Sequence, residues 1–521
     1  MKKMAILLTA VLLLGMLFSG CGQTAVSSIP EGGSSGPGQE AEGPYAGLSL
    51  EKEQKVVMYA SATEPNAIGE VLKLVNERTK AAINTTIDLY FIPSAERSTK
   101  YPLVMAGGDA VDLIYTANWC YYKEQVEKGG FMELTEDFLN KYMPQTMAAL
   151  PQAAWEETKI NGKMYMVPRN TAAIFPDVGP VINVDIAKKY GFDQDAIKTY
   201  DDFENFLLTV ADNEPGVFAF YASGSNTLYS LALTEKNNLI NNQASDYVFY
   251  SQLSDPTFQN AFFLYDSEMY KEYALRMARY AAAKVWPSDA ITNSNTTSAL
   301  FRNGQSASCA QNYYNGIVSI DSFRASGINA YLLDIFPEGY RPLRDSYIGD
   351  GMAIPAFSKI PERAAVALDF IKNDFETYML LAGGIEGRHY VYDKETNTVG
   401  PGPETGDYEF DGWAWGIRHQ DFPWPKTDDP YINAVNEKLQ EIQVKDEEWP
   451  FWGFTFDYAP VSAEWAVLSA LVNEYGTSFS LGQFGSATEQ TYEEFVGKLR
   501  EGGLDKYMEE WTRQRDAFLE K

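Results

Sequence analysis

The chain has 521 residues and a formal net charge of −29, and 45% of its residues are hydrophobic and 14% aromatic. This apolar content excludes an intrinsically disordered protein, and the length allows three or four domains of about 150 residues each or two large lobes. The acidic excess argues against nucleic-acid binding, because a phosphate backbone requires a basic patch and none is visible in the sequence. We therefore expect a folded protein without nucleic acid among its partners.

The first 21 residues have the pattern of a secretion signal. Two lysines precede an apolar run over residues 4–18, which is shorter than the roughly 20 residues of a membrane span. Two small residues then precede Cys21, and this ending resembles the lipobox of bacterial lipoproteins. The resemblance implies a signal peptide over residues 1–20, a lipid such as palmitate on Cys21, and attachment to the extracellular face of the cell membrane by that lipid alone. A plain secretion signal with a chance Cys is the alternative.

A flexible linker is expected over residues 21–50, where Gly, Ser, Pro and Glu dominate and no core can form. Beyond the linker no stretch approaches the length and apolarity of a membrane span. Cys120 and Cys309 are the two cysteines that remain after Cys21. One disulfide between them is possible outside the cell, but the chain lacks a dense cysteine framework, which favours two buried thiols.

Strand and helix patterns alternate over the next 60 residues or so. Short apolar runs predict three strands, at residues 56–59, 87–91 and 111–115. Apolar residues at helical spacing predict a helix after each of the first two strands, and Asn66 is expected to cap the first of these helices. The order strand, helix, strand, helix, strand indicates a parallel α/β sheet.

The remainder of the chain continues this mixture. Asn161-Gly162, between apolar residues, predicts a β-hairpin. Further strands are predicted at residues 181–184, 217–221, 307–310 and 330–336, with an extended crossing at 349–355. Helices are predicted over residues 199–210, 270–277, 361–371, 492–499 and 504–511. Residues 236–256 are expected to be irregular, and residues 392–430 to form an ordered surface excursion.

Several short motifs occur in a fixed order along most of residues 56–518. They are Ala106-Gly107-Gly108-Asp109, Gly162-Lys163-Met164-Tyr165, Phe301-Arg302-Asn303-Gly304, Gly384-Ile385-Glu386-Gly387 and Gly503-Leu504-Asp505, with the stretches 181–190, 354–371 and 454–461. Together they resemble the substrate-binding lipoproteins of carbohydrate ABC importers in Gram-positive bacteria. The last two motifs are similar to those of the large branch of this family, with chains of roughly 500 residues.

The resemblance implies an α/β fold with two lobes, the periplasmic-binding-protein-like (type II) fold, with hinge crossings and a helical C-terminus. Lobe 1 is expected to comprise residues 51–178 and 350–410, and lobe 2 residues 179–349 and 411–521. The resemblance further implies a monomeric receptor that captures a carbohydrate, in particular an oligosaccharide, between its lobes. It would deliver this ligand to the permease subunits of an ABC transporter, without catalysis and without a cofactor.

Sugars present apolar ring faces and hydroxyl groups, so a receptor needs aromatic side chains and planar or charged hydrogen-bonding partners. In open α/β folds such residues lie past the carboxyl ends of strands or in the crossings. The residues predicted to contact the ligand are Glu64, Asn118, Trp119, Arg169, Tyr221, Asn312, Tyr313, Asp350 and Trp413. Asn312 and Tyr313 also follow a strand where the resembling family has aromatic ligand contacts.

Structural roles are the alternative for several of these residues. Trp119 would fill the core of a lobe, Arg169 would pair with a neighbouring carboxylate, and Asp350 would serve the hinge. The tryptophans of the late aromatic-rich segments, apart from Trp413, are expected in the core, and Trp452 is one of them.

Two other functions stay open at this point. The same fold could bind a peptide or another solute, and a surface enzyme that processes glycans is the alternative of a different class. Carboxylates are plentiful enough for a glycosidase pair, but the sequence has no nucleophile elbow, Walker loop or dinucleotide fingerprint. Its two histidines, His389 and His419, are too far apart for a short metal-binding motif. We expect neither catalysis nor a bound metal.

Overall fold

The computed structural model describes residues 43–520 apart from short gaps. The gaps are residues 94–95, 108–109, 172–178, 225–226, 242–246, 251–254, 256, 294, 312, 411, 413–414 and 426–428. Residues 40–521 form one compact unit. The predicted signal peptide, Cys21 and residues 22–42 of the predicted linker lie outside the described residues. Among the helices that are described, none is long and apolar enough to cross a membrane.

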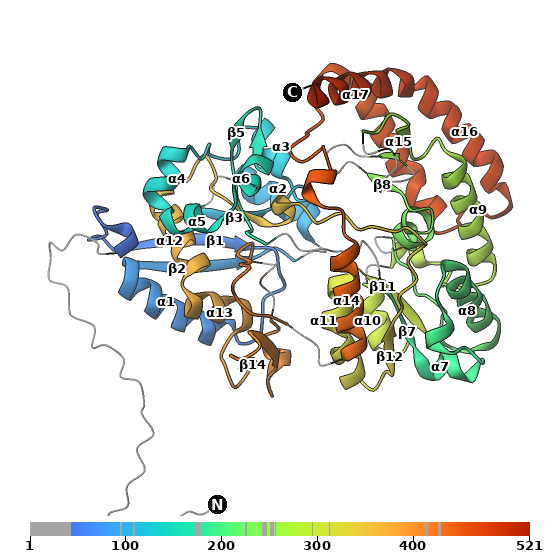
Figure 1. Ribbon diagram of the computed structural model, residues 1–521, viewed down its shortest axis with the longest axis horizontal. Coiled ribbons are helices and arrows are strands. Elements are labelled where there is room, and N and C mark those ends of the chain that lie inside the picture. The colour runs from blue at the N-terminus through green and yellow to red at the C-terminus, as the bar shows by residue number, and fades with distance from the viewer. Residues whose placement is uncertain are drawn as a thin grey trace, which may run out of the picture. The chain divides into compact units, whose positions relative to one another are not determined.

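The first sheet contains five strands in the order β2-β1-β3-β13-β6 (Figure 1). β2 and β3 run parallel to β1, whereas β13 runs antiparallel to both β3 and β6. This arrangement confirms the predicted parallel unit, although β3 begins two residues later than expected. The strands are β1 (Gln54–Ala60), β2 (Thr85–Phe91), β3 (Leu113–Thr116), β6 (Val167–Pro168) and β13 (Gly351–Ala353). The helices that connect the parallel strands are α1 (Ile68–Ile83) and α2 (Arg97–Gly107).

The first hydrophobic core forms around this sheet. Further helices that contribute to it are α4 (Glu136–Tyr142), α5 (Pro144–Ala149), α12 (Pro361–Asn373) and α13 (Phe375–Gly383). Tyr45 and Leu48 are buried in the same core, and the Tyr45 hydroxyl donates to Asp369 Oδ2 at 3.1 Å. Packed structure therefore begins inside the stretch that the sequence assigns to the linker, because these two apolar side chains find a partner surface there.

Local signals in the sequence explain most turns and caps, with one exception. Asn161 and Gly162 have φ values of 53° and 78° and join β4 (Lys159–Ile160) to β5 (Lys163–Met164), which confirms the predicted hairpin. The expected cap at Asn66 is wrong. The residue before α1 is Ala67, which makes no side-chain cap, and the Asn66 amide donates to Asp407 Oδ1 at 3.1 Å instead. A distant carboxylate thus competes successfully with the local backbone for this side chain.

The second sheet has three antiparallel strands in the order β11-β7-β12. They are β7 (Gly179–Asn183), β11 (Ser308–Gln311) and β12 (Ala330–Leu332), which confirms three of the predicted strands. The helices α7 (Val184–Lys189), α8 (Tyr200–Asn213), α9 (Glu268–Ala282), α10 (Thr297–Arg302), α11 (Tyr313–Ala325) and α14 (Pro430–Ile442) follow along the chain.

A second, aromatic-rich core contains Phe203, Tyr270 and Trp511. The described residues therefore form two large cores and a smaller third one that contains Phe301 and Phe323.

Two predictions in this region are wrong. The strand expected at residues 217–221 is reduced to one isolated bridge between Phe218 and Ser306. The backbone N–H of Phe220 donates instead to the carbonyl of Val285 at 3.1 Å. The segment expected to be irregular contains β8 (Ile240–Asn241) and β9 (Val248–Tyr250). In an antiparallel sheet, β9 pairs with β8 on one side and with β10 (Phe262–Phe263) on the other. Strands this short gain their stability from pairing, which the local sequence does not reveal.

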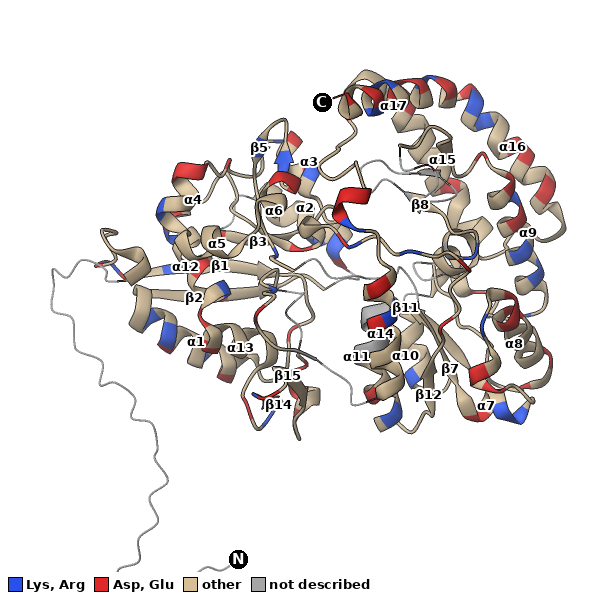
Figure 2. Cartoon of the chain, viewed as in Figure 1, with Lys and Arg blue, Asp and Glu red and all other residues tan. Residues whose placement is uncertain are grey.

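The C-terminus is helical, as predicted, with α15 (Ser462–Ser480), α16 (Thr488–Glu501) and α17 (Leu504–Leu519). Gly503 has a φ of 96° between the last two helices, a conformation that favours glycine. Acidic and basic residues are interspersed on α16 and α17 (Figure 2), and several form exposed ion pairs such as Arg513–Glu510. The acidic residues of these two helices are spread over solvated surfaces, where each ion pair contributes little to the stability of the fold.

Residues 392–430 are less superficial than the sequence predicts. They form a hairpin of β14 (Tyr390–Asp393) and β15 (Thr398–Pro401), and β15 also pairs with β16 (Trp424–Pro425). Beyond the hairpin, Tyr408, Trp415 and Ile417 are buried in the first core. The first core therefore continues to Ile417. The α/β class with mixed sheets and a helical C-terminus is confirmed, whereas the lobe boundaries stay a prediction.

Candidate ligand-binding site

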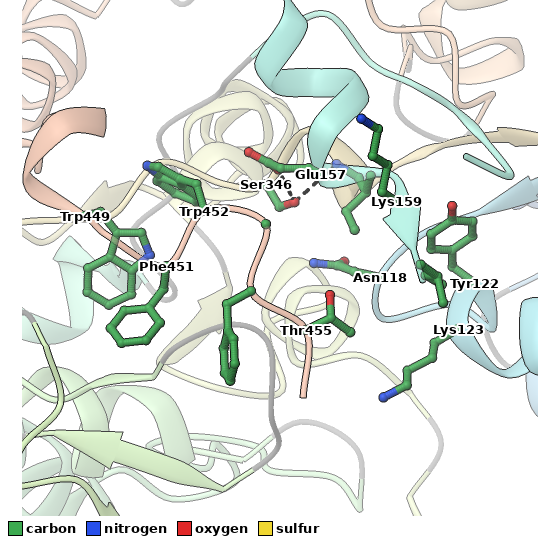
Figure 3. Close-up of a pocket in the computed structure, with 14 residues that line it drawn as sticks. Asn118, Tyr122, Lys123, Glu157, Lys159, Ser346, Trp449, Phe451, Trp452 and Thr455 are labelled. Atoms are coloured by element: carbon green, nitrogen blue, oxygen red, sulfur yellow. Dashed lines mark hydrogen bonds between the residues drawn. The ribbon is translucent and has the colours of Figure 1, made fainter. Parts of the chain in front are cut away.

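A pocket lies where segments of the two cores meet (Figure 3). Its cavity volume is about 120 Å³, and the space rises to about 720 Å³ when the part that opens to solvent is counted. The lining residues are Asn118, Tyr122, Lys123, Glu157, Lys159, Ile160, Ser346, Ile348, Trp449, Phe451, Trp452, Gly453, Phe454 and Thr455.

The lining combines aromatic rings with polar groups. Tyr122 and Lys123 come from α3 (Tyr122–Glu127), and Glu157 ends α6 (Gln152–Glu157), both built around the first core. The aromatic wall comes from residues 449–454, whose side chains join or pack against the second core. Aromatic faces bind the apolar face of a sugar ring, and the amide, ammonium and hydroxyl groups can bind its hydroxyls. The pocket therefore combines aromatic faces with hydrogen-bonding groups.

One stack of side chains forms the wall at Trp452. The guanidinium of Arg344 lies 3.5 Å from the centre of the Trp452 ring. Arg344 Nη2 donates to Glu157 Oε1 at 2.7 Å, and its Nε donates to Asp446 Oδ1 at 2.7 Å. The second oxygen of Glu157 accepts from Ser346 Oγ at 2.6 Å. The charges of Glu157 and Arg344 are thus compensated inside the wall.

Lys123 connects the two sides of the pocket. Its Nζ donates to the carbonyl of Phe456 at 2.7 Å and lies 4.2 Å from the centre of the Tyr458 ring. Lys123 belongs to α3 beside the first core, whereas Phe456 is buried in the second. This contact holds α3 against the segment that carries the aromatic wall.

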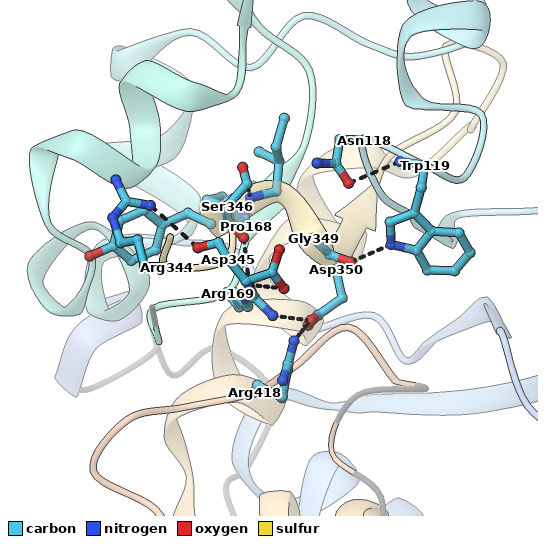
Figure 4. Close-up of polar contacts among 12 residues, drawn as sticks. Asn118, Trp119, Pro168, Arg169, Arg344, Asp345, Ser346, Gly349, Asp350 and Arg418 are labelled. Carbon is cyan, nitrogen blue, oxygen red and sulfur yellow. Dashed lines mark hydrogen bonds and ion pairs between the residues drawn. The ribbon is translucent and has the colours of Figure 1, made fainter. Parts of the chain in front are cut away.

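Asn118 and Trp119, two predicted site residues, follow β3 (Figure 4). Asn118 lines the pocket, and its backbone N–H donates to the carbonyl of Ile348 at 2.8 Å. The Trp119 ring is 49% exposed, which excludes the alternative of a core side chain. Its Nε1 donates to the carbonyl of Gly349 at 2.8 Å, and the Arg97 guanidinium lies 4.9 Å from the ring centre. Trp119 thus offers a fixed aromatic surface next to the pocket.

Arg169 and Asp350, also predicted, lie together in a buried network (Figure 4). Arg169 Nη1 donates to Asp350 Oδ2 at 3.0 Å and its Nη2 to Asp345 Oδ2 at 2.5 Å, and Arg418 donates to the same oxygen of Asp350. The three segments that carry Arg169, Asp350 and Arg418 are therefore tied at one point. Because Arg169 and Asp350 have no exposed surface, ligand contact by either stays a prediction.

Two other predicted site residues, Glu64 and Tyr221, do not line the pocket. Glu64 is exposed in the loop after β1, and Tyr221 is half-buried with its ring 5.2 Å from that of Phe218. Tyr313 is the first residue of α11. Asn312 and Trp413 lie outside the described residues.

The sequence reasoning missed most of the pocket. Tyr122, Lys123, Glu157 and Ser346 carry no distinctive motif. The Trp-Pro-Phe-Trp-Gly-Phe run at residues 449–454 is a visible signal, but its tryptophans were expected to fill the core. Trp449 is buried in the second core and also lines the pocket, whereas Trp452 lines the pocket and is only partly buried.

The two remaining cysteines agree with the prediction of buried thiols. Cys120 and Cys309 are both free and buried. Burial raises the pKa of Cys120 to about 12 and also raises that of Cys309, so neither forms a reactive thiolate at neutral pH. Within the described residues no cluster of His, Cys, Asp and Glu has the arrangement of a metal site.

His419 follows Arg418 of the buried network in the sequence. Because of this histidine, we expect the folded protein to lose stability at acidic pH. Burial and, secondarily, the charge of Lys372 lower its pKa from 6.5 to about 4. At a pH between these two pKa values, His419 binds a proton in the unfolded chain but not in the folded chain. The free energy of unfolding is therefore highest above pH 6.5 and decreases as the pH falls toward 4. In His419→Gln, the unfolding free energy should therefore decrease less between pH 6.5 and 4.5, by up to about 3 kcal/mol. Urea unfolding at several pH values tests this, and parallel curves for the two proteins would contradict it.

Two family models match the chain. Residues 64–374 match the model described as bacterial extracellular solute-binding protein, and residues 450–520 match that of a domain of unknown function, DUF3502. None of the curated protein sequences matches significantly.

Solved structures of similar proteins cover nearly the whole chain. The N-glycan transport solute binding protein NgtS from Streptococcus pneumoniae, in complex with Man1GlcNAc, has a TM-score of 0.74 and 18% identity over 90% of this chain and 100% of that chain. The S. pneumoniae ABC-transporter substrate binding protein FusA, in complex with kestose, has a TM-score of 0.59 and 16% identity over 89% of this chain and 99% of that chain. An HMO binding ABC-transporter associated solute binding protein from Bifidobacterium longum infantis has a TM-score of 0.58 and 14% identity over 90% of this chain and 100% of that chain.

At these identities the structural similarity shows the fold, and it confirms the predicted two-lobed binding-protein architecture. The family itself follows from the sequence model. Because the model of bacterial extracellular solute-binding proteins matches more than half of the residues, the chain belongs to that family.

Proposed function

We propose that this protein binds an oligosaccharide in the pocket between its two lobes and delivers it to the permease of an ABC transporter. The observation that carries the proposal is the pocket itself, which has Trp452 and Phe451 on one side and Asn118, Tyr122 and Lys123 on the other. Aromatic faces beside hydrogen-bonding groups suit sugar rings. The solved structures named above were obtained with Man1GlcNAc and kestose, which supports the same ligand class. Members of this family bind solutes and are not enzymes, in agreement with the expectation from the sequence.

Ligand binding should close the two lobes. In this proposal lobe 1 contains the first core and lobe 2 the second, and a bound ligand contacts both. A ligand that binds the closed form more tightly shifts the population toward it. Small-angle scattering should show a smaller radius of gyration at saturating ligand, and the protein should remain a monomer. An unchanged scattering curve would contradict lobe closure.

A lipid anchor at Cys21 would keep this receptor at the extracellular face of the membrane. The support for this part is the sequence pattern of residues 1–21. Cys21→Ser should release the protein from the membrane fraction into the medium and abolish labelling by an alkyne analogue of palmitate. Continued labelling of the Cys21→Ser protein would overturn the assignment.

A thermal-shift screen of residues 22–521 tests the ligand class. Mono- and oligosaccharides, amino acids and short peptides are compared, since a ligand that binds the native state at one hundred times its Kd adds about 2.7 kcal/mol of stability. A shift with one class of oligosaccharides is expected. A shift only with peptides would replace carbohydrate by peptide as the ligand of the same fold. Release of new reducing ends from a glycan would instead indicate that the protein is an enzyme that processes glycans.

Trp119→Ala should weaken binding of longer oligosaccharides by about tenfold. Trp119 lies next to Asn118 but outside the pocket lining, so a sugar ring beyond the pocket would stack on it. A tenfold loss corresponds to about 1.4 kcal/mol. Isothermal titration with a disaccharide and with a longer oligosaccharide of the same series provides the internal control. Equal losses for both lengths, or no loss for either, would contradict a separate subsite at Trp119.

A further inference from the structure

We propose that Arg344 is a positioning residue that fixes the Trp452 ring as the aromatic wall of the ligand pocket. The inference rests on the proposed function for its effect on sugar affinity, but the positioning itself can be tested without any ligand. Arg344 is not among the lining residues of the pocket, whereas Trp452 is. The guanidinium therefore covers one face of the ring, and a ligand can meet only the opposite face or the edge.

Arg344 is itself held in place by charged partners. Its side chain is 5% exposed, and its Nη2 and Nε donate to Glu157 and Asp446 at 2.7 Å each. Its Nη1 donates to the backbone carbonyl of Asp345 at 3.3 Å (Figure 4). A planar guanidinium with hydrogen bonds at all three nitrogens has a fixed plane, and an aromatic ring that stacks on it takes its orientation from that plane.

The Trp452 ring lacks the other common means of orientation. Two other indole N–H groups are held by hydrogen bonds, Trp119 Nε1 to Gly349 and Trp286 Nε1 to Leu481, whereas Trp155 Nε1 is not. Trp452 Nε1 is buried and has no hydrogen-bond partner among the described residues. The position of this ring is therefore set by its contact with Arg344 and by neighbouring rings such as Trp449, 6.4 Å away.

The partners of Arg344 come from both sides of the pocket. Glu157 ends α6 beside the first core, whereas Asp446 shortly precedes the wall segment that packs against the second. Arg344 thus aligns the wall with the part of the first lobe that faces it. A lysine at this position would keep the charge, but it has no planar fork to hold both carboxylates and stack on the ring.

Fluorine NMR of the chain labelled with 5-fluorotryptophan tests the positioning. The chain has 10 tryptophans, and Trp452→Phe identifies the resonance of Trp452. Arg344→Lys should shift or broaden this resonance and leave distant ones unchanged. Asp446→Asn, which removes one anchor of the guanidinium, should cause a smaller change in the same direction. The matched control is Arg341→Lys, because Arg341 pairs with Glu448 and with backbone carbonyls at Ile442 and Gln443. An unchanged Trp452 resonance in Arg344→Lys, or an equal change in Arg341→Lys, would overturn the proposal.

Affinity measurements connect the positioning to the site. Maltotetraose, 1-kestose and N,N′-diacetylchitobiose serve as probes. Arg344→Lys should weaken binding of the active probe about 2- to 30-fold, and it should change affinity less than about twofold in a Trp452→Ala background, because the ring it positions is then absent. Equal losses in both backgrounds would overturn the proposal. If no probe binds the unmodified protein, the carbohydrate function fails and the fluorine spectra alone decide the role of Arg344.

Discussion

Alanine in place of Trp452 should weaken oligosaccharide binding at least about 30-fold. Trp452 is the partly buried ring that both lines the pocket and stacks on a fixed guanidinium, so a sugar ring would lose its aromatic contact entirely. Removal of a central aromatic anchor at a binding site typically costs about 2 kcal/mol or more, which is about 30-fold in Kd. Isothermal titration with the ligand found in the screen measures the change.

The matched control for this experiment is Trp465→Ala. Trp465 is also a partly buried tryptophan at the second core, with its ring 4.6 Å from that of Tyr458, but it does not line the pocket. Its removal should lower the melting temperature without changing Kd more than about twofold, whereas Trp452→Phe should keep part of the affinity. If Trp452→Ala binds like the unmodified protein while it remains folded, the pocket is not the sugar site.

Asp350→Asn should lower the free energy of unfolding by about 3–5 kcal/mol. Asp350 is fully buried and accepts hydrogen bonds from Arg169 and Arg418, which are almost fully buried as well. The substitution keeps the shape of the side chain but removes the negative charge, and two buried guanidinium groups then lose a shared counter-charge. Breaking a buried ion pair by removing one partner has an effect of this size.

Urea unfolding of Asp350→Asn beside Asp88→Asn tests this expectation. Asp88 pairs with Lys55 at 2.9 Å at the surface, where their side chains are 35% and 62% exposed. Loss of such a pair should cost less than about 1 kcal/mol. Similar losses in the two variants would show that the network around Asp350 is not a major source of stability.

Patterns within short stretches of sequence were reliable where local physics decides the structure. The apolar runs and helical spacings of residues 56–115 gave the β1, β2 and β3 strands and their parallel order, and Asn161-Gly162 gave the hairpin, because turn conformation and side-chain periodicity are local properties. The motifs along the chain resemble a receptor family, and the family model confirms that resemblance. The position just after the β3 strand predicted Asn118 and Trp119 as site residues. Asn118 lines the pocket, and ligand contact by either residue stays a prediction.

Only the tertiary structure decided which distant side chains meet. Trp415 and Trp452 are both tryptophans in aromatic-rich segments, yet the first is 2% exposed in the core and the second lines the pocket. Arg169 and Asp350 were candidates for ligand contact, and the fold joins them to Arg418 from a third segment in a buried network. The partners of Arg344 lie about 100 residues or more away in the chain, at Asp446 and Glu157.

The sequence by itself determined the fold class, the helical C-terminus and the solute-binding family. Periodicity and turn residues depend on neighbouring residues, and the order of the motifs can be read directly along the chain. Only the tertiary structure shows that Trp452 lines the pocket, that Arg344 stacks on its ring and that Asp350 is buried. Stacking and buried ion pairs depend on distances of a few ångströms between segments far apart in the chain, and such distances exist only after the chain has folded.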